Sequence, residues 1–368
     1  MDIEQGRYSS IAFKDEPKKT TDIDEELERI IAQQSAKIKV AGIGGAGNNT
    51  INRMSEIGII GATTIAINTD AQDLLYTRAE DKILIGKEIT RGLGAGSLPQ
   101  VGEEAARESE HDIKSKLQGA DMVFITCGLG GGTGTGAAPV VAEIAKKIGA
   151  LTVGVVTIPF SMEGQRRYDN AMVGLERMEN NCDTLIVIPN DKLIELAPDL
   201  PLHTAFKVAD EILTNAVRGI AELVTKTGLV NLDFADIRTV MGKGGVAMIG
   251  VGESDTEDRA KEAVQKAINS PLLDVDITGA NGALINVCGG KDMSLKEAKE
   301  VVETVSEKLS DDARIIWGAQ ISEDLHRTIR AMLIVTGVES PQIFGPRLKL
   351  REKEKKAMAS ELGIEFLG

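Results

Sequence analysis

The sequence predicts an α/β fold in which a parallel sheet carries helices on both faces, followed by a long central helix and a second, smaller α/β domain. Short apolar segments alternate with helical patterns from residue 37 to residue 201, which is typical of parallel strands buried on both sides. An unbroken helical pattern then runs over 202–227 and ends at Gly228, a C-terminal cap. A further set of strand and helix patterns follows it.

Six segments of the first half predict strands, because each is a nearly continuous apolar run of strand length. They are AKIKVAGI (36–43), TTIAINT (63–69), KILIG (82–86), DMVFITCGL (121–129), LTVGVVTIPF (151–160) and TLIVIPN (184–190). Strong helix formers with helical spacing lie between them, and these segments predict the covering helices. The clearest are INRMSEIGI (51–59), GEEAARESEHDIKSKLQG (102–119) and APVVAEIAKKIG (138–149).

The second half repeats this alternation on a smaller scale. Its segments are GGVAMIGVGES (244–254), DITGANGALINVCGG (276–290), ARIIWGAQI (313–321) and TIRAMLIVTGV (328–338), with helical patterns over 256–270 and 294–309. We therefore expect a smaller sheet with its own helices and place the domain boundary at the long helix. The predicted parts are a flexible N-terminal arm (1–36), a nucleotide-binding domain (37–201), the central helix (202–228), a C-terminal α/β domain (229–339) and a flexible tail (340–368).

Charge and composition exclude several classes of protein. The formal net charge is −14, which argues against a nucleic-acid binder, because neutralising phosphates needs clustered Lys and Arg. The three cysteines form no CxxC pair and the three histidines no HExxH motif, so we predict neither disulfides nor a protein-held metal. No run of 18 apolar residues occurs, so we expect a cytoplasmic protein without a transmembrane segment.

Three glycine loops follow predicted strands, and they point to a polyphosphate ligand. Residues 42–47 form a literal GxGxxG, and Asp70 ends the next strand; together they resemble the dinucleotide-binding fingerprint. The loop GGGTGTG (130–136) has five glycines and two threonines, whose N–H groups and hydroxyls suit a di- or triphosphate. GLGAG (92–96) lies between the two. No GxxxxGK[ST] occurs, which excludes a P-loop.

Two other interpretations of these loops stay open at this point. A GxGxxG followed by an acid also fits a nicotinamide-dependent oxidoreductase, although no His or Lys stands out as its acid/base partner. A lone glycine turn without any ligand is the simplest alternative for residues 42–47.

The motifs resemble those of the FtsZ family, the prokaryotic relatives of tubulin. GGGTGTG is the signature that the tubulin and FtsZ families share, and the other matching segments occur in the family's order over residues 37–338. They are GGAGNN (44–49), AINTDAQ (66–72), RGLGAG (91–96), TIPFSMEGQRR (157–167), VIPNDKL (187–193) and NLDFADIR (231–238). The resemblance implies a tubulin/FtsZ-like fold with a Rossmann-like nucleotide-binding sheet, GTP or GDP as the ligand, and Mg²⁺ bound mainly through phosphates and water.

The resemblance also implies which residues contact the nucleotide. Those expected around the phosphates are Gly45, Ala46, Gly47, Asn48, Asn49, Ala71, Gly94, Ala95, Gly96, Gly131, Gly132, Thr133, Gly134, Thr135 and Gly136. Glu163 would meet the ribose and Arg167 would reach the sugar-phosphate region; their i, i+4 spacing also fits a surface ion pair on one helical face. Asn190, Phe206 and Asp210 would recognise guanine, where a carboxylate can accept from the N1–H and N2–H edge.

Asn231, Asp233 and Asp236 are the expected catalytic residues, and their position in the chain suggests where they act. Phe206 and Asp210 lie at the start of the long helix, whereas these three lie just past its end. A helix of about 23 residues spans roughly 35 Å, so the acids cannot reach the nucleotide of their own chain. They would instead position the attacking water on a neighbour's GTP, in a head-to-tail filament. Without the resemblance, NLDFAD would indicate only a helix cap and turn.

The resemblance further implies a cytoskeletal GTPase that forms the cell-division ring in the cytoplasm. A paralogue that polymerises without turnover is the alternative, and intact Asp233 and Asp236 argue against it. The stretch 347–356 could touch anionic lipid, although its glutamates favour a solvated linker. The final ELGIEFLG (361–368) departs from the bacterial tail motif and indicates an archaeal-type tail that docks to a membrane-tethering adaptor.

Overall fold

The structure is a computed structural model that describes residues 36–338, apart from positions 60, 197–201, 226–229, 231–232, 243, 274–276, 278–279, 311 and 323. The side chains at 194–196, 202–203 and 205–206 also lie outside the description. The predicted tail, and the predicted arm up to residue 35, fall outside the described residues. The described residues all belong to one compact unit.

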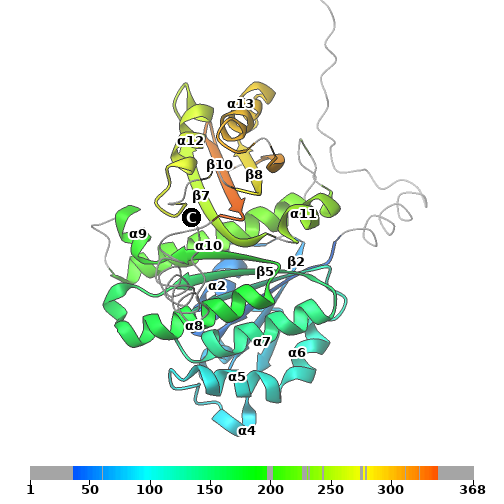
Figure 1. The fold of residues 1–368 in the computed structure, drawn as a ribbon, viewed down its shortest axis with the longest axis vertical. Helices are drawn as coiled ribbons and strands as arrows, with labels where there is room; N and C mark the ends of the chain where they lie inside the picture. Colours follow the sequence, from blue (N-terminus) through cyan, green and yellow to red (C-terminus); the bar gives the residue numbers. More distant parts are fainter. Residues whose placement is uncertain are drawn as a thin grey trace, which may run out of the picture. The chain divides into compact units, whose positions relative to one another are not determined.

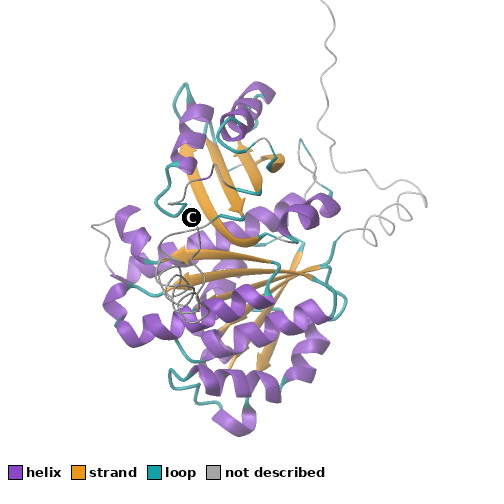
Figure 2. Ribbon diagram, viewed as in Figure 1, coloured by secondary structure: helices purple, strands orange, loops and turns teal. Residues whose placement is uncertain are grey.

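All six strands predicted in the first half are present and pair in parallel (Figures 1 and 2). They are β1 (Ile38–Ile43), β2 (Ala62–Asn68), β3 (Asp81–Leu84), β4 (Met122–Gly128), β5 (Leu151–Ile158) and β6 (Thr184–Pro189). Their spatial order is β3-β2-β1-β4-β5-β6, which is the doubly wound Rossmann order. The strand order therefore reverses between β1 and β4, and ligands of such sheets bind at the carboxyl ends beside this point.

Helices cover both faces of the sheet, because successive strand residues point to opposite sides. Val40 and Phe124 pack with α2 (Gly44–Ile57) and α10 (Leu202–Thr225), whereas Ala41 and Ile125 pack on the other side with α5 (Pro99–Glu108) and α7 (Thr133–Lys147). The remaining helices of this half are α3 (Ala71–Tyr76), α4 (Lys87–Thr90), α6 (Glu110–Leu117), η1 (Ser161–Glu163), α8 (Gln165–Asn181) and α9 (Asp191–Leu196). The prediction of a parallel sheet buried on both faces is confirmed.

One predicted helix proves to be two. The pattern over 102–119 predicts a single helix, but the structure ends α5 at Glu108 and starts α6 at Glu110. Ser109 between them leaves helical geometry at φ −103°, ψ 19°. Its hydroxyl accepts a hydrogen bond from the amide of Gly86 at 3.2 Å, so a contact from a distant loop fixes the break, and helical spacing alone does not reveal it.

The second half does not form a separate sheet. Its strands are β7 (Gly245–Ser254), β8 (Gly282–Gly289), β9 (Arg314–Ile321) and β10 (Ile329–Thr336), and they continue the first six in the order β7-β10-β8-β9. The connection is a parallel pairing of β6 with β7 over three residue pairs, from Thr184–Gly245 to Ile186–Ala247. The expectation of a separate, smaller sheet was therefore wrong, because this short pairing of β6 with β7 joins all the strands into a single ten-stranded sheet.

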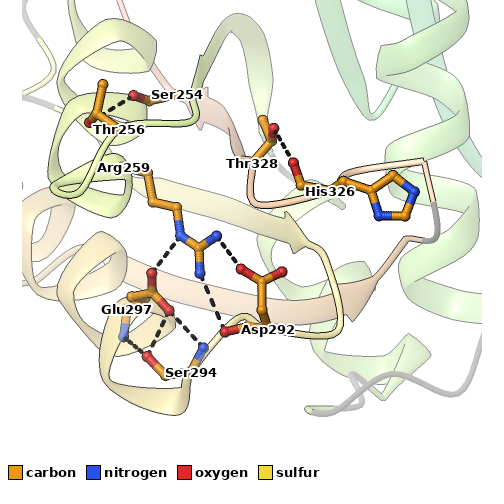
Figure 3. A network of polar contacts seen from close by, with 8 residues as sticks. All are labelled: Ser254, Thr256, Arg259, Asp292, Ser294, Glu297, His326 and Thr328. Atoms are coloured by element: carbon orange, nitrogen blue, oxygen red, sulfur yellow. Dashed lines mark hydrogen bonds and ion pairs between the residues drawn. The ribbon is translucent and has the colours of Figure 1, made fainter.

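A polar network joins the two helices that cover this second half, α12 (Arg259–Ile268) and α13 (Leu295–Ser306) (Figure 3). The Arg259 guanidinium donates to Glu297 at 2.6 Å and to Asp292 at 2.5 Å. The hydrogen bond from Arg259 lowers the pKa of the Glu297 carboxyl to about 2. Ser294 and Glu297 form a capping box at the start of α13, so one carboxylate both caps a helix and holds its neighbour.

Candidate functional site

The amino termini of α2 and α7 lie side by side where the strand order reverses. α2 follows β1 and α7 follows β4, and a Cβ atom on Gly44 would lie 3.0 Å from the Gly134 amide nitrogen. Neither helix has a side-chain cap or an acidic residue in its first turn. Free N–H groups at two adjacent helix N-termini, with no carboxylate to neutralise them, form a binding site for an anion.

The glycines of the three loops fall into two groups, and the difference points to a ligand. Added Cβ atoms on Gly47, Gly134 and Gly136 would lie 2.6, 2.6 and 1.9 Å from backbone oxygens, so packing alone requires glycine there. A Cβ on Gly45 would meet nothing within 4 Å, and one on Gly131 would meet only the Arg167 guanidinium at 4.0 Å. Neither Gly45 nor Gly131 has a positive φ angle. The packing of the chain does not require glycine at these two positions, and glycine there leaves room for a group from outside the chain to approach the backbone closely.

The backbone of the third loop, residues 91–96, is held against the residues that follow β2. The Ala71 amide donates to the Gly92 carbonyl at 3.0 Å, and the Gly94 amide donates to Thr69 at 3.2 Å. Gly96, at φ 57°, has open space at its missing Cβ. Each of the three loops thus contributes a glycine that faces open space.

Two predicted ligand residues turn their side chains inward. Asn48 is fully buried and its amide donates to Asp73 at 2.8 Å. Thr135 is also buried, and its hydroxyl accepts from the Gly130 amide at 2.9 Å. Both side chains brace the loops from behind, whereas Gly45, Ala46 and Asn49 are exposed.

Glu163 and Arg167 form an ion pair at the rim of this region. They do not share one helix, as their spacing predicts, because Gly164 at φ 97° separates η1 from α8. The Glu163 carboxylate also accepts from the Phe160 amide at 2.9 Å. Since the Arg167 guanidinium is the nearest group to the open face of Gly131, this cation lies next to the glycine loop 130–136.

The three residues predicted to recognise guanine come from the ends of β6 and α10. Asn190 is buried, and its side-chain oxygen has no hydrogen-bond partner within the described part of the chain, which marks it as a candidate ligand contact. Burial raises the pKa of the Asp210 carboxyl from 3.8 to about 6, and Arg53 of α2 opposes this shift. The side chain of Phe206 lies outside the described residues.

The predicted catalytic acids lie at the opposite edge of the sheet. Asp233 caps α11 (Phe234–Met241) by accepting from the Ala235 amide at 3.0 Å, and Asp236 is exposed in its first turn. From the same helix, Arg238 donates to the carbonyl of Asp121 at 3.4 Å, which immediately precedes β4. The glycine loop 130–136 follows the other end of this seven-residue strand, and such a strand spans about 23 Å. Asn231 lies outside the described residues.

Sequence patterns missed two side chains that connect the loops. The hydroxyl of Thr69, at the end of β2, lies 2.6 Å from the hydroxyl of Thr133. The amide of Asn170 donates to Ser97 and to Gly130, both at 3.4 Å. The only available signal for Thr69 was its place at the carboxyl end of a predicted strand, and Asn170, within α8, had none.

Two family models match the chain. The GTPase domain of the Tubulin/FtsZ family matches residues 37–198, and the C-terminal domain of the FtsZ family matches residues 245–339. The chain belongs to the FtsZ family. It is accordingly a GTPase of the tubulin/FtsZ type, with a guanine-nucleotide-binding, cytoskeletal role in cell division. The nicotinamide-dependent alternative is therefore dropped.

Curated relatives and solved structures agree with this assignment. The chain is 64% identical to Cell division protein FtsZ 1 of Thermococcus kodakarensis over 339 residues, which is 92% of this chain and 91% of that protein. It superimposes on an empty FtsZ dimer of M. jannaschii with a TM-score of 0.83 and 64% identity, covering 86% of this chain and 93% of the other. CetZ2 from Haloferax volcanii shares the fold, at a TM-score of 0.73 and 21% identity over 88% of this chain and 99% of that one.

Proposed function

We propose that this chain binds GTP in the cradle of the three glycine loops and hydrolyses it only when a second copy, joined head to tail, presents Asp233 and Asp236 to that nucleotide. One observation supports the proposal above all others: the cradle and the acids lie at opposite edges of one sheet. An acid cannot orient water on a phosphate about 20 Å away. A contact between unlike surfaces propagates as a filament, and the relative from M. jannaschii was solved as a dimer.

Each part of the chain then has a separate task. The helix N-termini and the N–H groups near Gly45, Gly96 and Gly131 bind the phosphates, with Ala71 and Arg167 at the rim. The remaining residues predicted at the phosphates shape this cradle. Asp210 and Asn190 select guanine over adenine, with Phe206 stacking on the base. Asp233 and Asp236, assisted by Asn231, orient and polarise the attacking water from the neighbouring subunit, which is sufficient for phosphoryl transfer.

We infer that Mg²⁺ enters with the nucleotide. Within the described ranges, no group of three or more His, Cys, Asp or Glu side chains is placed to hold a metal. Phosphates and water therefore supply most of its ligands, as is usual for this ion. The ion neutralises charge on the phosphates, and the protein needs to contribute little beyond that.

GTP turnover per subunit, measured over a wide range of protein concentration, tests this proposal. We expect negligible turnover below a threshold concentration and a plateau above it, because the site is complete only between subunits. Measurable turnover that does not change with concentration would place a whole site within one chain and overturn the assignment of Asp233 and Asp236. Filament formation without any hydrolysis would instead favour the non-hydrolysing paralogue.

Other predictions stay proposals of the same kind. They comprise the domain limits at 201, 228 and 339, assembly into a ring at the division site, and an adaptor that tethers the tail to a membrane. None of the helices in the described ranges combines the length and apolar character needed to cross a bilayer. Fluorescent labelling of the full chain and of a chain ending at residue 360 would test the tail, because loss of the final ELGIEFLG should abolish recruitment to the membrane.

A further inference from the structure

The carboxylate of Asp73 lies behind the glycine loops, and Asp73 is not among the residues predicted to bind nucleotide. One of its oxygens accepts two hydrogen bonds, from the Asn48 amide at 2.8 Å and from the Asn68 amide at 2.6 Å. Asn48 and Asn68 are buried, at 0% and 3% exposure. Buried amide groups need partners, and a carboxylate oxygen can accept from both at once.

The bonds from Asp73 lead to all three loops. Asn48 directly follows the first turn of α2, in which Gly45 and Ala46 are exposed. Asn68 is the last residue of β2, and its side-chain oxygen accepts from the Thr69 amide at 2.8 Å. Thr69 then connects to both remaining loops, because its carbonyl accepts from the Gly94 amide and its hydroxyl pairs with that of Thr133.

We propose that Asp73 is a positioning residue that holds the three phosphate-binding loops in register for GTP. This inference rests on the proposed function of those loops. Asp73 does not touch the nucleotide in this scheme; it acts through Asn48 on one side and through Asn68 and Thr69 on the other. A carboxylate suits this place because charge-assisted hydrogen bonds are stronger and shorter than neutral ones.

The alternative role for Asp73 is stabilisation of α3 alone. An acid in the first turn of a helix interacts favourably with its N-terminal N–H groups, and Asp73 is the only acid in the first turn of α3. That role would influence folding and leave nucleotide affinity unchanged. The two roles are therefore separable by comparing affinity with stability.

The test compares Asp73→Ala, Asp73→Asn and the control Gln72→Ala, an exposed neighbour on the same helix. Binding of a fluorescent GTP analogue and thermal unfolding of the nucleotide-free full chain are measured for each. Asp73→Ala should weaken binding about 10- to 100-fold, Asp73→Asn should restore it to within about threefold because its amide oxygen still accepts, and Gln72→Ala should match the wild type. Wild-type affinity in Asp73→Ala would overturn the inference, as would a loss that tracks lower stability and is not rescued by Asn.

A double-mutant cycle with Asn48→Ala adds a second test. If Asp73 acts through Asn48, the double variant should bind no more weakly than about the weaker single variant, whereas multiplied losses would contradict the connection. Asn48→Ala also removes the same hydrogen bond if Asp73→Ala fails to fold. Failure of the proposed function looks different, since the wild-type chain itself would then not bind the GTP analogue.

Discussion

Glycines in the three loops serve two purposes, and the space around each one separates them. At Gly134 the missing side chain makes room for the Gly128 carbonyl, whereas at Gly131 it leaves an opening beside Arg167. The count of glycines in GGGTGTG predicts a phosphate site, but it assigns the whole motif to ligand binding. The structure divides the motif into residues that pack the fold and residues that face the opening.

Alanine substitutions should reveal this division. Gly131→Ala should fold normally and weaken GTP binding about tenfold or more, because the methyl group enters the space for a phosphate. Gly134→Ala should lower the free energy of unfolding by about 1–3 kcal/mol, because its Cβ would lie 2.6 Å from the Gly128 carbonyl oxygen. Nucleotide titration and chemical unfolding measure the two effects, and equal loss of stability in both variants would contradict the division.

Asp210 should make GTP binding depend on pH. Its carboxyl has a pKa of about 6 because it is buried, despite the opposing charge of Arg53. We expect GTP affinity to fall as the pH drops from 7.5 to 5.5, because a protonated carboxyl loses acceptor capacity toward the guanine edge. Titrations at several pH values measure this. Asp210→Asn should remove most of the dependence, and an unchanged pH profile in that variant would assign it to another group.

The same residue should limit the stability of the nucleotide-free protein. Since the folded pKa of about 6 exceeds the unfolded value of 3.8, the contribution of Asp210 to stability is fully present below about pH 4 and is lost as the pH rises through 6. At pH 7.5 the ionised, partly buried group therefore opposes folding. Asp210→Asn should stabilise the nucleotide-free chain by about 1–3 kcal/mol, which thermal unfolding detects.

At the scale of elements, most helices and strands follow from local pattern, and the exceptions have specific causes. All six predicted strands of the first half occur, because short apolar runs between helical patterns fit strands that are buried on both faces. The break at Ser109 depends on a hydrogen bond from Gly86, and that contact exists only in the folded chain. The sequence also did not reveal that the side chains of Asn48 and Thr135 point inward, because a motif match gives the position of the backbone and not the direction of each side chain.

The cap of α11 allows the structural and catalytic roles of Asp233 to be separated. Asn is as good an N-cap as Asp, so Asp233→Asn should keep the hydrogen bond to the Ala235 amide and lose only the charge. We expect near-normal thermal unfolding and GTP binding, with turnover reduced by about tenfold or more. Asp233→Ala should in addition cost about 1 kcal/mol of stability. Wild-type turnover in Asp233→Asn would contradict a catalytic role for Asp233 and show that it acts only as the N-cap of α11.

At the scale of the whole molecule, two sheets expected to be separate meet through β6 and β7. This pairing could not be predicted from the sequence. It involves only three residue pairs, and both strands are apolar whether or not they pair with each other. The alternation of strands and helices, the long helix and the positions of the loops were predictable, whereas the spatial order of the strands was not among the predictions. The relative placement of cradle and acids was also predictable in outline, because it depends on helix length and strand direction alone.

Mixing two inactive variants should restore turnover if the sites are shared between subunits. Asp236→Ala retains the cradle, and Gly45→Glu retains the acids while placing a carboxylate where the phosphates bind. Equimolar mixing should recover a measurable part of wild-type GTP turnover. The matched control is a partner that carries both substitutions, which should recover none. Recovery with that partner, or none with the single variant although both chains cosediment, would contradict shared sites.

The separation of cradle and acids across one sheet has a consequence for the ends of a filament. In the head-to-tail filament that we propose, every internal junction would bring one cradle to one pair of acids. The last subunit at one end, however, would hold a nucleotide that no acids reach, and the last at the other end would present its acids to solvent. Such a polymer would be polar, with two chemically different ends. At the end whose nucleotide no acids reach, GTP would persist after the GTP at the internal junctions had been hydrolysed.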